Sequence, residues 1–600
     1  MKILLGAVNA KYIHTNLAVH SLLACCREFS QDISLKEYTI NQEKDQILKD
    51  IYYRAPEVLC FSCYIWNISY VKDLIRDLHK ILPDTVIWAG GPEVSYDPEN
   101  FLKEMPHVCG VMLGEGEETF QKLAKHYIDE GQEKEETLSG IPGVCFRTEK
   151  GIVNTGFPEV MDMDQLVFPY EDLSRYAHKI LYYESSRGCP FSCSYCLSSV
   201  DKKLRFKSLD LVKKELGIFL KEKVPQVKFV DRTFNCRESH ALEIWQYIKD
   251  HDNGVTNFHF EIGADLLTEK EIGLIRTMRP GLIQLEIGVQ STNEKTLKEI
   301  RRYAPFEKIR ANVQAVRKGG NIHQHLDLIA GLPWEDYESF SRSFNDVYSL
   351  YPQQLQLGFL KVLKGSYMHE KAGDYGCLYK EREPYEVLET RWLSYEDIIR
   401  LKSVEEMTEI YYNSGQFAHT IRAVEKEFSD PFSFYEDLGN FYEKKGYDTL
   451  SHSRIRRYEI LLEFLEEKKV ASLDFYRQLM IYDLYARENM KTRPSWAPER
   501  ESWKEKVRDF YEREKESPCY LQGYQAYSSR QTEKMTHLEV FTWNVIEGKS
   551  EKGIYPVVFD YQKRSPLTND ALAVPVELAD FQKTDVRESM EESRKNTERG

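Results

Sequence analysis

The chain has 600 residues, 42% of them hydrophobic and 12% aromatic, which is typical of a globular protein with three or more domains. Its net charge of −15 argues against a sequence-independent grip on nucleic acid, which needs clustered lysine and arginine. No apolar run reaches the roughly 18 residues that span a bilayer, and the opening MKILLGAVNAKY does not resemble a signal peptide. Twelve cysteines are too few for a disulfide scaffold, so we expect a cytoplasmic protein.

Four apolar segments near the N-terminus, each followed by a helix-length amphipathic stretch, predict a doubly wound open α/β sheet. They are residues 2–10, 57–67, 85–91 and 108–119. Ligands of such sheets bind at the carboxyl ends of the strands, and Gly90 and Gly91 end the third segment, where a missing Cβ allows close approach. The sequence GEGEET at residues 114–119 is a poor phosphate loop because its glutamates repel phosphate, so we reject a dinucleotide site there.

Three cysteines, Cys189, Cys193 and Cys196, have the spacing C-x3-C-x2-C without a second pair beside them. Short-spaced thiolates indicate zinc or an iron–sulfur cluster. Structural zinc needs four ligands, and the nearest upstream histidine, His178, lies eleven residues before Cys189. A cubane cluster on three thiolates instead leaves one iron open to a small molecule. Ligand counting therefore favours the cluster and leaves zinc as the alternative.

With Tyr195 directly before the last cysteine, the motif resembles that of the radical S-adenosylmethionine (SAM) enzymes. The resemblance implies a 4Fe–4S cluster on Cys189, Cys193 and Cys196, whose open iron chelates the methionine part of SAM. One electron, from a donor such as flavodoxin or ferredoxin, then cleaves SAM to a 5′-deoxyadenosyl radical. The cofactor carries the hard chemistry, while the protein orients it and excludes water.

Four further apolar segments alternate with helix-length stretches and predict a parallel α/β barrel or partial TIM barrel. They are residues 226–235, 258–268, 282–292 and 323–335. A polar residue stands toward the end of each apolar run: Asp231, Glu261, Gln290 and Asp327. Any one of them could simply cap a helix or turn, but four at corresponding strand ends favour a site.

The sequences GVQS at residues 288–291 and DLIAGLP at residues 327–333 resemble the oxygen-independent coproporphyrinogen dehydrogenase and elongator-like branch of this superfamily. That resemblance implies a SAM site formed by Tyr183, Tyr195, Glu261, Gln290, Arg302 and Asp327. The glycine-rich turn after the second strand of this branch is replaced by VDRTFN. We expect the backbone amides of Asp231 and Arg232 to make that contact instead.

The order of AGGPEVS, GEGEET, a hairpin over residues 141–155 and the cysteine motif resembles cobalamin-binding radical SAM enzymes. It implies a flavodoxin-like or Rossmann-like domain that holds the corrin edge near Ser62, Gly90, Gly91 and Ser95. The chain lacks the D-x-H-x-x-G motif, so we favour a solvent-facing or capping role for His14 over the alternative that it ligates cobalt. Cys60 and Cys63 lie three apart in one strand and face opposite ways, so we do not expect a second cluster.

From about Tyr375 the chain is rich in Tyr, Glu, Lys and Arg with helical periodicity, and residues 537–545 and 554–564 predict two strands. The predicted domains are 1–135, cobalamin-binding type; 136–180, hairpin and linker; 181–370, radical SAM core; 371–510, helical; 511–582, small α+β; and 583–600, a disordered tail.

The resulting hypothesis is an enzyme with one cluster, SAM and cobalamin that transfers a methyl group to an unactivated centre of a small-molecule substrate. An oxidoreductase that performs a cobalamin-associated cyclisation or rearrangement without methylation is the first alternative. The second is a redox or cobalamin sensor that cleaves nothing. A sensor needs no cofactor pocket of this detail, which argues against it.

Overall fold

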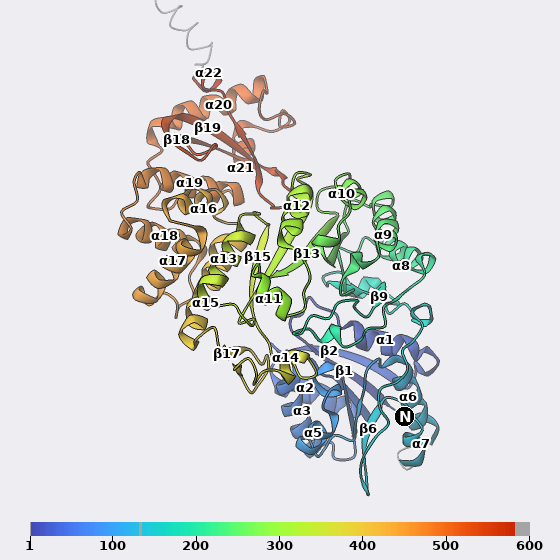
Figure 1. Ribbon diagram of the computed structural model, residues 1–600. Helices are drawn as coiled ribbons and strands as arrows, with labels where there is room; N and C mark the ends of the chain where they lie inside the picture. The colour runs from blue at the N-terminus through green and yellow to red at the C-terminus, as the bar shows by residue number, and fades with distance from the viewer. Residues whose placement is uncertain (1, 131–134, 583–600) are drawn as a thin grey trace, which may run out of the picture. The chain divides into compact units, whose positions relative to one another are not determined.

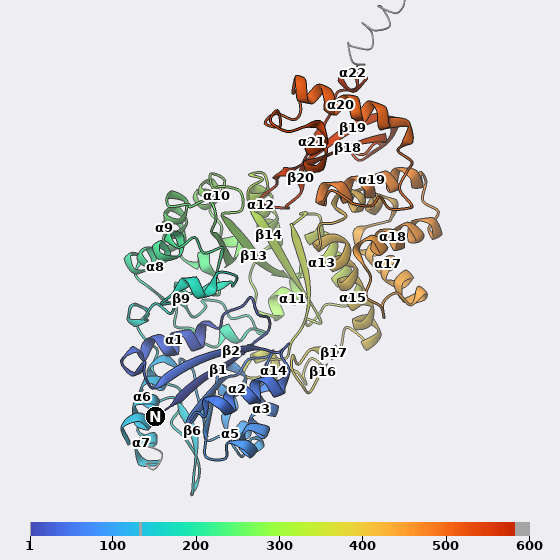
Figure 2. The same cartoon turned by 180° about the vertical axis from the view of Figure 1, so that it is seen from behind.

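The computed structural model describes residues 2–130 and 135–582 (Figure 1; Figure 2 from behind). Two compact units make up the chain. Unit 1 comprises the residues up to Ser343 together with Leu357–Ile398, and unit 2 comprises Phe344–Gln356 and the chain from Ile399 on. The tail predicted to be disordered, 583–600, lies outside the described residues. Within the described ranges, no helix has the length and apolar character needed to cross a membrane.

The first sheet of unit 1 has seven strands in the order β2-β1-β3-β4-β5-β6-β7. The first five run parallel: β1 (Ile3–Asn9), β2 (Ile33–Thr39), β3 (Val58–Ser62), β4 (Val86–Gly90) and β5 (Gly110–Met112). The predicted hairpin forms β6 (Val144–Thr148) and β7 (Gly151–Asn154), which continue the sheet antiparallel. The predicted doubly wound sheet is confirmed.

Helices cover both faces of this sheet, because its central strands are apolar on both sides (Figure 1). One core contains residues of α2 (Lys44–Arg54), α3 (Ile68–Ile81) and α5 (Pro98–Glu104). The core on the opposite face contains residues of α1 (Leu17–Cys25), α6 (Glu117–Glu130) and α7 (Glu135–Ser139). Cys60 belongs to this second core and Cys63 to the first. The two thiols therefore lie on opposite faces, as predicted.

Strand β2, at the edge of the sheet, was absent from the sequence prediction. Its inward-pointing Glu37 accepts hydrogen bonds from the Asn16 amide (2.7 Å) and from Asn9 Nδ2 (2.9 Å). Lys179 Nζ lies 3.3 Å from the other oxygen. Burial alone would raise the pKa of Glu37, but His20 and Lys179 hold it at about 2. The edge strand thus carries a buried, fully paired charge.

The second sheet of unit 1 has six strands in the order β15-β14-β13-β12-β11-β8. They are β8 (Leu181–Tyr183), β11 (Gln226–Phe229), β12 (Asn257–Ile262), β13 (Ile283–Gln290), β14 (His323–Ala330) and β15 (Gln354–Phe359). Strands β8 and β11 to β14 pair in parallel, as the predicted partial barrel requires. The connecting helices are α8 (Leu209–Lys221), α9 (Glu238–Asp250), α10 (Glu269–Ile275), α11 (Glu294–Glu299), α12 (Phe306–Arg317) and α13 (Tyr337–Tyr348).

The two faces of this second sheet differ in polarity. Residues such as Val227, Phe258, Leu285 and Leu326 are fully buried on the helix-covered face. On the other face, polar side chains lie side by side across the strands. The register aligns Lys228, His259, Gln284 and His323 in one row and Glu261, Glu286 and His325 in the next. We call these residues the polar rows; they extend from the strand ends into the barrel.

Unit 2 contains a helical part followed by a small sheet. Its longer helices are α17 (Pro431–Lys445), α18 (Arg454–Glu467), α19 (Leu473–Arg487) and α20 (Lys504–Glu516). The two predicted strands are β18 (Thr536–Asn544) and β19 (Lys549–Arg564), and a third, β20 (Ala571–Pro575), completes an antiparallel sheet. The described helices and strands agree with the predicted composition of this region, whereas the predicted domain boundaries stay predictions.

Candidate active site

The three cysteines lie in a loop that follows strand β9 (Ser186–Arg187) of unit 1. Together they line a cavity of about 200 Å³. Gly188 begins the loop at a φ of +85°, and a Cβ there would lie 2.6 Å from the Lys203 carbonyl oxygen, so only glycine fits. Burial raises the pKa of Cys189. A bound metal cluster would reverse this, because its ligands are thiolates.

Five of the seven predicted SAM residues line the same cavity: Tyr195, Glu261, Gln290, Arg302 and Asp327. Arg302 Nη1 lies 3.9 Å from Cys193 Sγ, and its other terminal nitrogen donates to the Gly288 carbonyl. Burial raises the pKa of Glu261 to about 7 and also raises that of Asp327. The carboxyl ends of β12, β13 and β14 thus bring carboxylates, an amide and a guanidinium to the cysteines.

Gln290 has two features that point to a ligand. Its φ is +74°, a strained value for a residue with a side chain, and it follows a register shift between Gly288 and Gln290. Its buried Oε1 has no hydrogen-bond partner among the described residues. A side chain at Gly288 would collide with the Gln290 amide nitrogen, because its Cβ would lie 2.2 Å away. The backbone is thus shaped to present an unsatisfied amide to the cavity.

Tyr183 and Asp231 are not among the residues that line this cavity. The Tyr183 hydroxyl donates to Glu215 (2.7 Å). Asp231 is buried and accepts from the Ser185 amide (3.0 Å) and the Ser185 hydroxyl (2.6 Å), and burial raises its pKa to about 6. The neighbouring Arg232 does line the cavity. Asp231 therefore holds the backbone at Ser185, whereas Tyr183 pairs with the side chain of Glu215.

The four predicted cobalamin residues, Ser62, Gly90, Gly91 and Ser95, all line a second cavity, of about 330 Å³, at the strand ends of the first sheet. Gly91 has a φ of +111°, and a Cβ there would lie 2.5 Å from the Cys63 carbonyl oxygen. The Ser95 hydroxyl donates to the Gly91 carbonyl (2.8 Å), and Ser62 Oγ accepts from Asn16 (3.2 Å). The glycine is therefore required by the backbone itself as well as by the cavity.

A third cavity, of about 1050 Å³, is lined by residues of both sheets of unit 1. From the first sheet come Tyr64 and Trp66, whose rings stack at 4.4 Å. From the cysteine loop and the barrel come Tyr195 and Arg232. His14 also lies here, and the Tyr182 hydroxyl is 2.7 Å from its Nδ1. His14 therefore lines this shared space, and its predicted solvent-facing or capping role stays a prediction.

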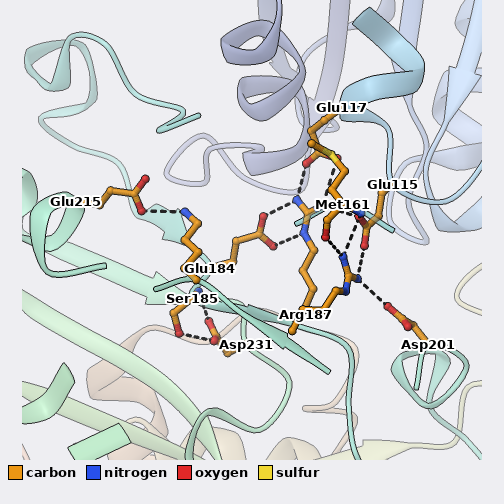
Figure 3. A network of polar contacts seen from close by, with 11 residues as sticks. Glu115, Glu117, Met161, Glu184, Ser185, Arg187, Asp201, Glu215 and Asp231 are labelled. Carbon is orange, nitrogen blue, oxygen red and sulfur yellow. Dashed lines mark hydrogen bonds and ion pairs between the residues drawn. The ribbon is translucent and has the colours of Figure 1, made fainter. Parts of the chain in front are cut away.

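A network of ion pairs crosses between the two sheets (Figure 3). Arg187, two residues before Cys189, contacts Glu115, Glu117 and Glu184, with its Nη1 3.3 Å from Glu115 and its Nε 3.0 Å from Glu184. Arg205, in β10 (Arg205–Phe206), contacts Glu115 and Asp201. Two of the three GEGEET glutamates, Glu115 and Glu117, therefore pair with arginines of the cysteine-loop hairpin.

Sequence reasoning missed two groups of residues. The first is the ion-pair network, because pairing between distant segments leaves no local pattern. The second is the polar rows, in which Lys228 Nζ and His259 Nε2 lie 2.9 and 2.7 Å from Glu286. Here a signal exists, since FHFEI and HQHLDL alternate polar and apolar residues with a period of two.

The family comparisons agree with this geometry. Residues 3–124 match the B12 binding domain and residues 183–347 the radical SAM superfamily. Residues 373–559 match a family described as a protein of unknown function, DUF4080.

Two curated proteins illustrate the range of relatives. The cobalamin-dependent radical SAM methyltransferase TokK of Streptomyces tokunonensis is 26% identical over 312 residues, which are 48% of this chain and 44% of TokK. The anaerobic magnesium-protoporphyrin IX monomethyl ester cyclase of Synechocystis sp. is 26% identical over 255 residues, 40% of this chain and 49% of the cyclase. The chain thus spans about half the length of the curated relatives it matches.

Among solved structures, the radical S-adenosylmethionine methyltransferase TsrM of Kitasatospora setae, with cobalamin and a [4Fe-4S] cluster bound, has a TM-score of 0.51 and 17% identity. The alignment covers 63% of this chain and 76% of TsrM, and at that identity it speaks for the fold. The predicted resemblance is confirmed: the chain carries a B12 binding domain followed by a radical SAM domain, with a DUF4080 region after them.

Proposed function

We propose that this protein is a cobalamin-dependent radical SAM enzyme that transfers a methyl group to an unactivated centre of a small molecule. The observation that carries the proposal is the cavity in which three cysteine thiols meet an unsatisfied, strained glutamine at the ends of parallel strands. When bound, the cluster supplies one electron for reductive cleavage of SAM, and cobalamin serves as the methyl carrier.

Cys189, Cys193 and Cys196 would hold the cluster. Three soft thiolates suit iron–sulfur ligation, and the loop leaves no fourth cysteine among the residues lining the cavity. All twelve cysteines are free, which suits a reducing cytoplasm. We further propose flavodoxin or ferredoxin as the electron donor.

Gln290, Asp327, Glu261 and Arg302 would hold SAM. The free Oε1 of Gln290 and the Asp327 carboxylate can accept hydrogen bonds from the ribose hydroxyls. Arg302 carries a buried Nε without a hydrogen-bond partner in the described part of the chain, and it can pair with the methionine carboxylate. Glu261 can accept from the methionine ammonium. These four contacts would orient SAM toward the cysteines and shield it from water.

Ser62, Gly90, Gly91 and Ser95 would border the corrin. Their cavity is lined mostly by apolar and small residues, and it opens beside the larger cavity shared with the barrel. Both cavities have Tyr64 and Tyr96 on their walls, so a ligand of the first sheet lies next to the shared space. In this proposal, cobalamin and SAM would lie on either side of one substrate space.

The similarity to the Synechocystis cyclase favours a second candidate, a radical cyclisation or rearrangement without net methylation. Products separate the two. Methyl transfer consumes a second SAM and yields S-adenosylhomocysteine beside 5′-deoxyadenosine, whereas rearrangement yields no S-adenosylhomocysteine.

Anaerobically reconstituted protein with a low-potential reductant tests the proposal. We expect hydroxocobalamin uptake with a spectral shift, together with formation of 5′-deoxyadenosine and S-adenosylhomocysteine. Ala18→Trp should block uptake and leave the iron content unchanged, because Ala18 lines both the corrin cavity and the shared cavity. Ala18→Ser is the matched control. Gly91→Leu is a poorer probe, since its Cβ would strike the Cys63 carbonyl. Absence of cobalamin uptake by the wild type would remove the methyl-transfer proposal.

A further inference from the structure

We propose that Arg187, Arg205 and Glu115 couple the cluster loop to the corrin cavity, so that the protein binds cobalamin more tightly once the cluster is in place. The inference rests on the proposed function, because it takes both cofactors as given. Arg187 is in this view a positioning residue: it acts through the segments on either side of it.

The cluster loop is the connection between the strands of a two-stranded hairpin. Strands β9 and β10 pair antiparallel, with Arg187 directly opposite Arg205. All three cysteines lie between these two strands in the sequence. The loop is closed at its base, because the Cys189 amide donates to the Asp201 carbonyl (3.2 Å). Any displacement of the two arginines therefore shifts both ends of the loop.

Glu115 joins the two arginines. Like charges directly opposite each other in a β-pair repel. The Glu115 carboxylate relieves this, since it lies 3.3 Å from Arg187 Nη1 and 3.2 Å from Arg205 Nη1. The Met161 amide donates to the same carboxylate (3.2 Å), and Arg205 donates to the Met161 carbonyl (2.9 Å). Without Glu115 the two facing arginines lose the carboxylate that both contact, and each keeps separate partners: Glu117 and Glu184 for Arg187, and Asp201 for Arg205.

The segment that carries Glu115 also forms a wall of the corrin cavity. Gly114, Glu115, Gly116 and Glu117 line that cavity, directly after strand β5. Glu117 pairs with Arg187 as well, and its side chain is 6% exposed. The segment 114–117 thus lines the corrin cavity, while its two carboxylates Glu115 and Glu117 also hold the arginines of the cluster-loop hairpin (Figure 3). A cluster that fixes the cysteine loop therefore also fixes the segment that lines the corrin cavity, and bound cobalamin fixes the loop in return.

The charge of the network argues that it does more than stabilise the fold. It holds the carboxylates Glu115, Glu117, Glu184 and Asp201 against two arginines. Buried ion pairs add little stability compared with apolar packing, and their best-attested use is to fix register or to switch. Here the ion pairs fix the position of the cysteine loop relative to the segment 114–117, which lines the corrin cavity.

Two linked binding measurements test the coupling. Hydroxocobalamin is titrated into protein with the reconstituted cluster and into the Cys189→Ala, Cys193→Ala, Cys196→Ala variant, which holds no iron. We expect the cluster to tighten cobalamin binding at least about 5-fold, the lower end of ordinary coupling between sites. By reciprocity, cobalamin should slow the loss of iron to a chelator.

Substitutions in the ion-pair network should abolish the ratio of cobalamin affinities with and without the cluster. Glu115→Gln and Arg187→Gln should each bring this ratio close to 1. Arg187→Lys should retain part of the coupling, because the charge remains but the forked geometry is lost. Glu118→Gln is the matched control: it lies in the same GEGEET segment, but its carboxylate lies 3.6 Å from Lys122 on the surface of the same helix. It should keep the wild-type ratio.

The outcomes separate the two proposals. Cobalamin binding with equal affinity in both iron states, or an equal loss of coupling in Glu118→Gln, overturns the coupling and leaves the proposed function intact. No cobalamin binding in either state overturns both. If Glu115→Gln does not fold, Arg187→Lys and chelator protection of the wild type still decide the question.

Discussion

The two parallel sheets of unit 1 use their faces differently. The first sheet buries apolar side chains on both faces, so its candidate ligand contacts lie at strand ends and in the loops beyond them. The second sheet buries one face and places the polar rows on the other. The strands of the first sheet therefore only support the ligand-contacting loops, whereas the strands of the second sheet themselves carry polar side chains that face the site. Substitutions in the first sheet should therefore alter stability, whereas substitutions on the inner face of the second should alter ligand binding.

The largest expected effect concerns the cysteine loop. Reconstituted protein should hold about four irons per chain, the content of one cubane cluster, and changing Cys189, Cys193 and Cys196 together to alanine should abolish it. Iron analysis and the absorption of the cluster give the measurement. About eight irons, or iron retained in the triple variant, would defeat the single-cluster assignment.

A smaller effect is expected at Asp327, which follows the polar-row residues His323 and His325 along strand β14. Asp327→Ala should keep the iron yet weaken SAM binding about ten- to a hundred-fold, because a hydrogen bond to a charged group is worth roughly 1.5–3 kcal/mol. Equilibrium binding of SAM measures this. His323→Ala, on the same strand but in the row farther from the cysteines, is the control and should bind normally. Equal affinities in both variants would assign Asp327 a structural role only.

The next prediction concerns the pH dependence of stability without cofactors. Burial, with Glu286 next, raises the pKa of Glu261 from 4.5 to about 7. Between these values the folded protein holds a proton that the unfolded chain has lost, so the free energy of unfolding should fall as pH rises from about 4.5 to 7 and then level. After solvent screening the contribution is about 1–2 kcal/mol. Glu261→Gln should flatten this part of the urea-denaturation profile; an identical slope in both proteins would contradict it.

The smallest effect on ligands is expected in the first sheet. Cys60→Ala and Cys63→Ala should leave iron content and SAM affinity unchanged, since the two thiols lie in separate apolar cores. Each should lower the free energy of unfolding by roughly 0.5–3 kcal/mol, as buried substitutions commonly do. Loss of iron in either variant would reopen the question of a second cluster.

The sequence predicted most of unit 1 because strand–helix alternation and the cysteine spacing are local signals. The strands it missed are those with weak local signals. Strand β2 lies at an edge and carries Ser34, Lys36 and Glu37, and β8 has only three residues. Of the polar rows only Glu261 was predicted, because polar residues were sought at the ends of the strands and not along them.

The candidate site was predictable to the extent that a motif fixed it. Eight of the ten residues predicted for the cluster and SAM line one cavity, because parallel strands bring their carboxyl ends to the same edge of the sheet. The contacts of Glu115 with Arg187 and Arg205 could not be foreseen, because they join segments about 70 to 90 residues apart that only the fold brings together.

The paired Glu37 of the edge strand also bears on how the protein behaves at high concentration. An exposed strand edge invites a second chain to add to the sheet, and proteins commonly prevent this with inward-pointing charges on that strand. Adding a strand to β2 would require displacing the surroundings of a carboxylate already held by Asn9, Asn16 and Lys179. At the other edge, β7 spans only Gly151–Asn154, too short for extended pairing. Both edge strands, β2 and β7, therefore disfavour edge-to-edge pairing of sheets, which leads to aggregation at high protein concentration.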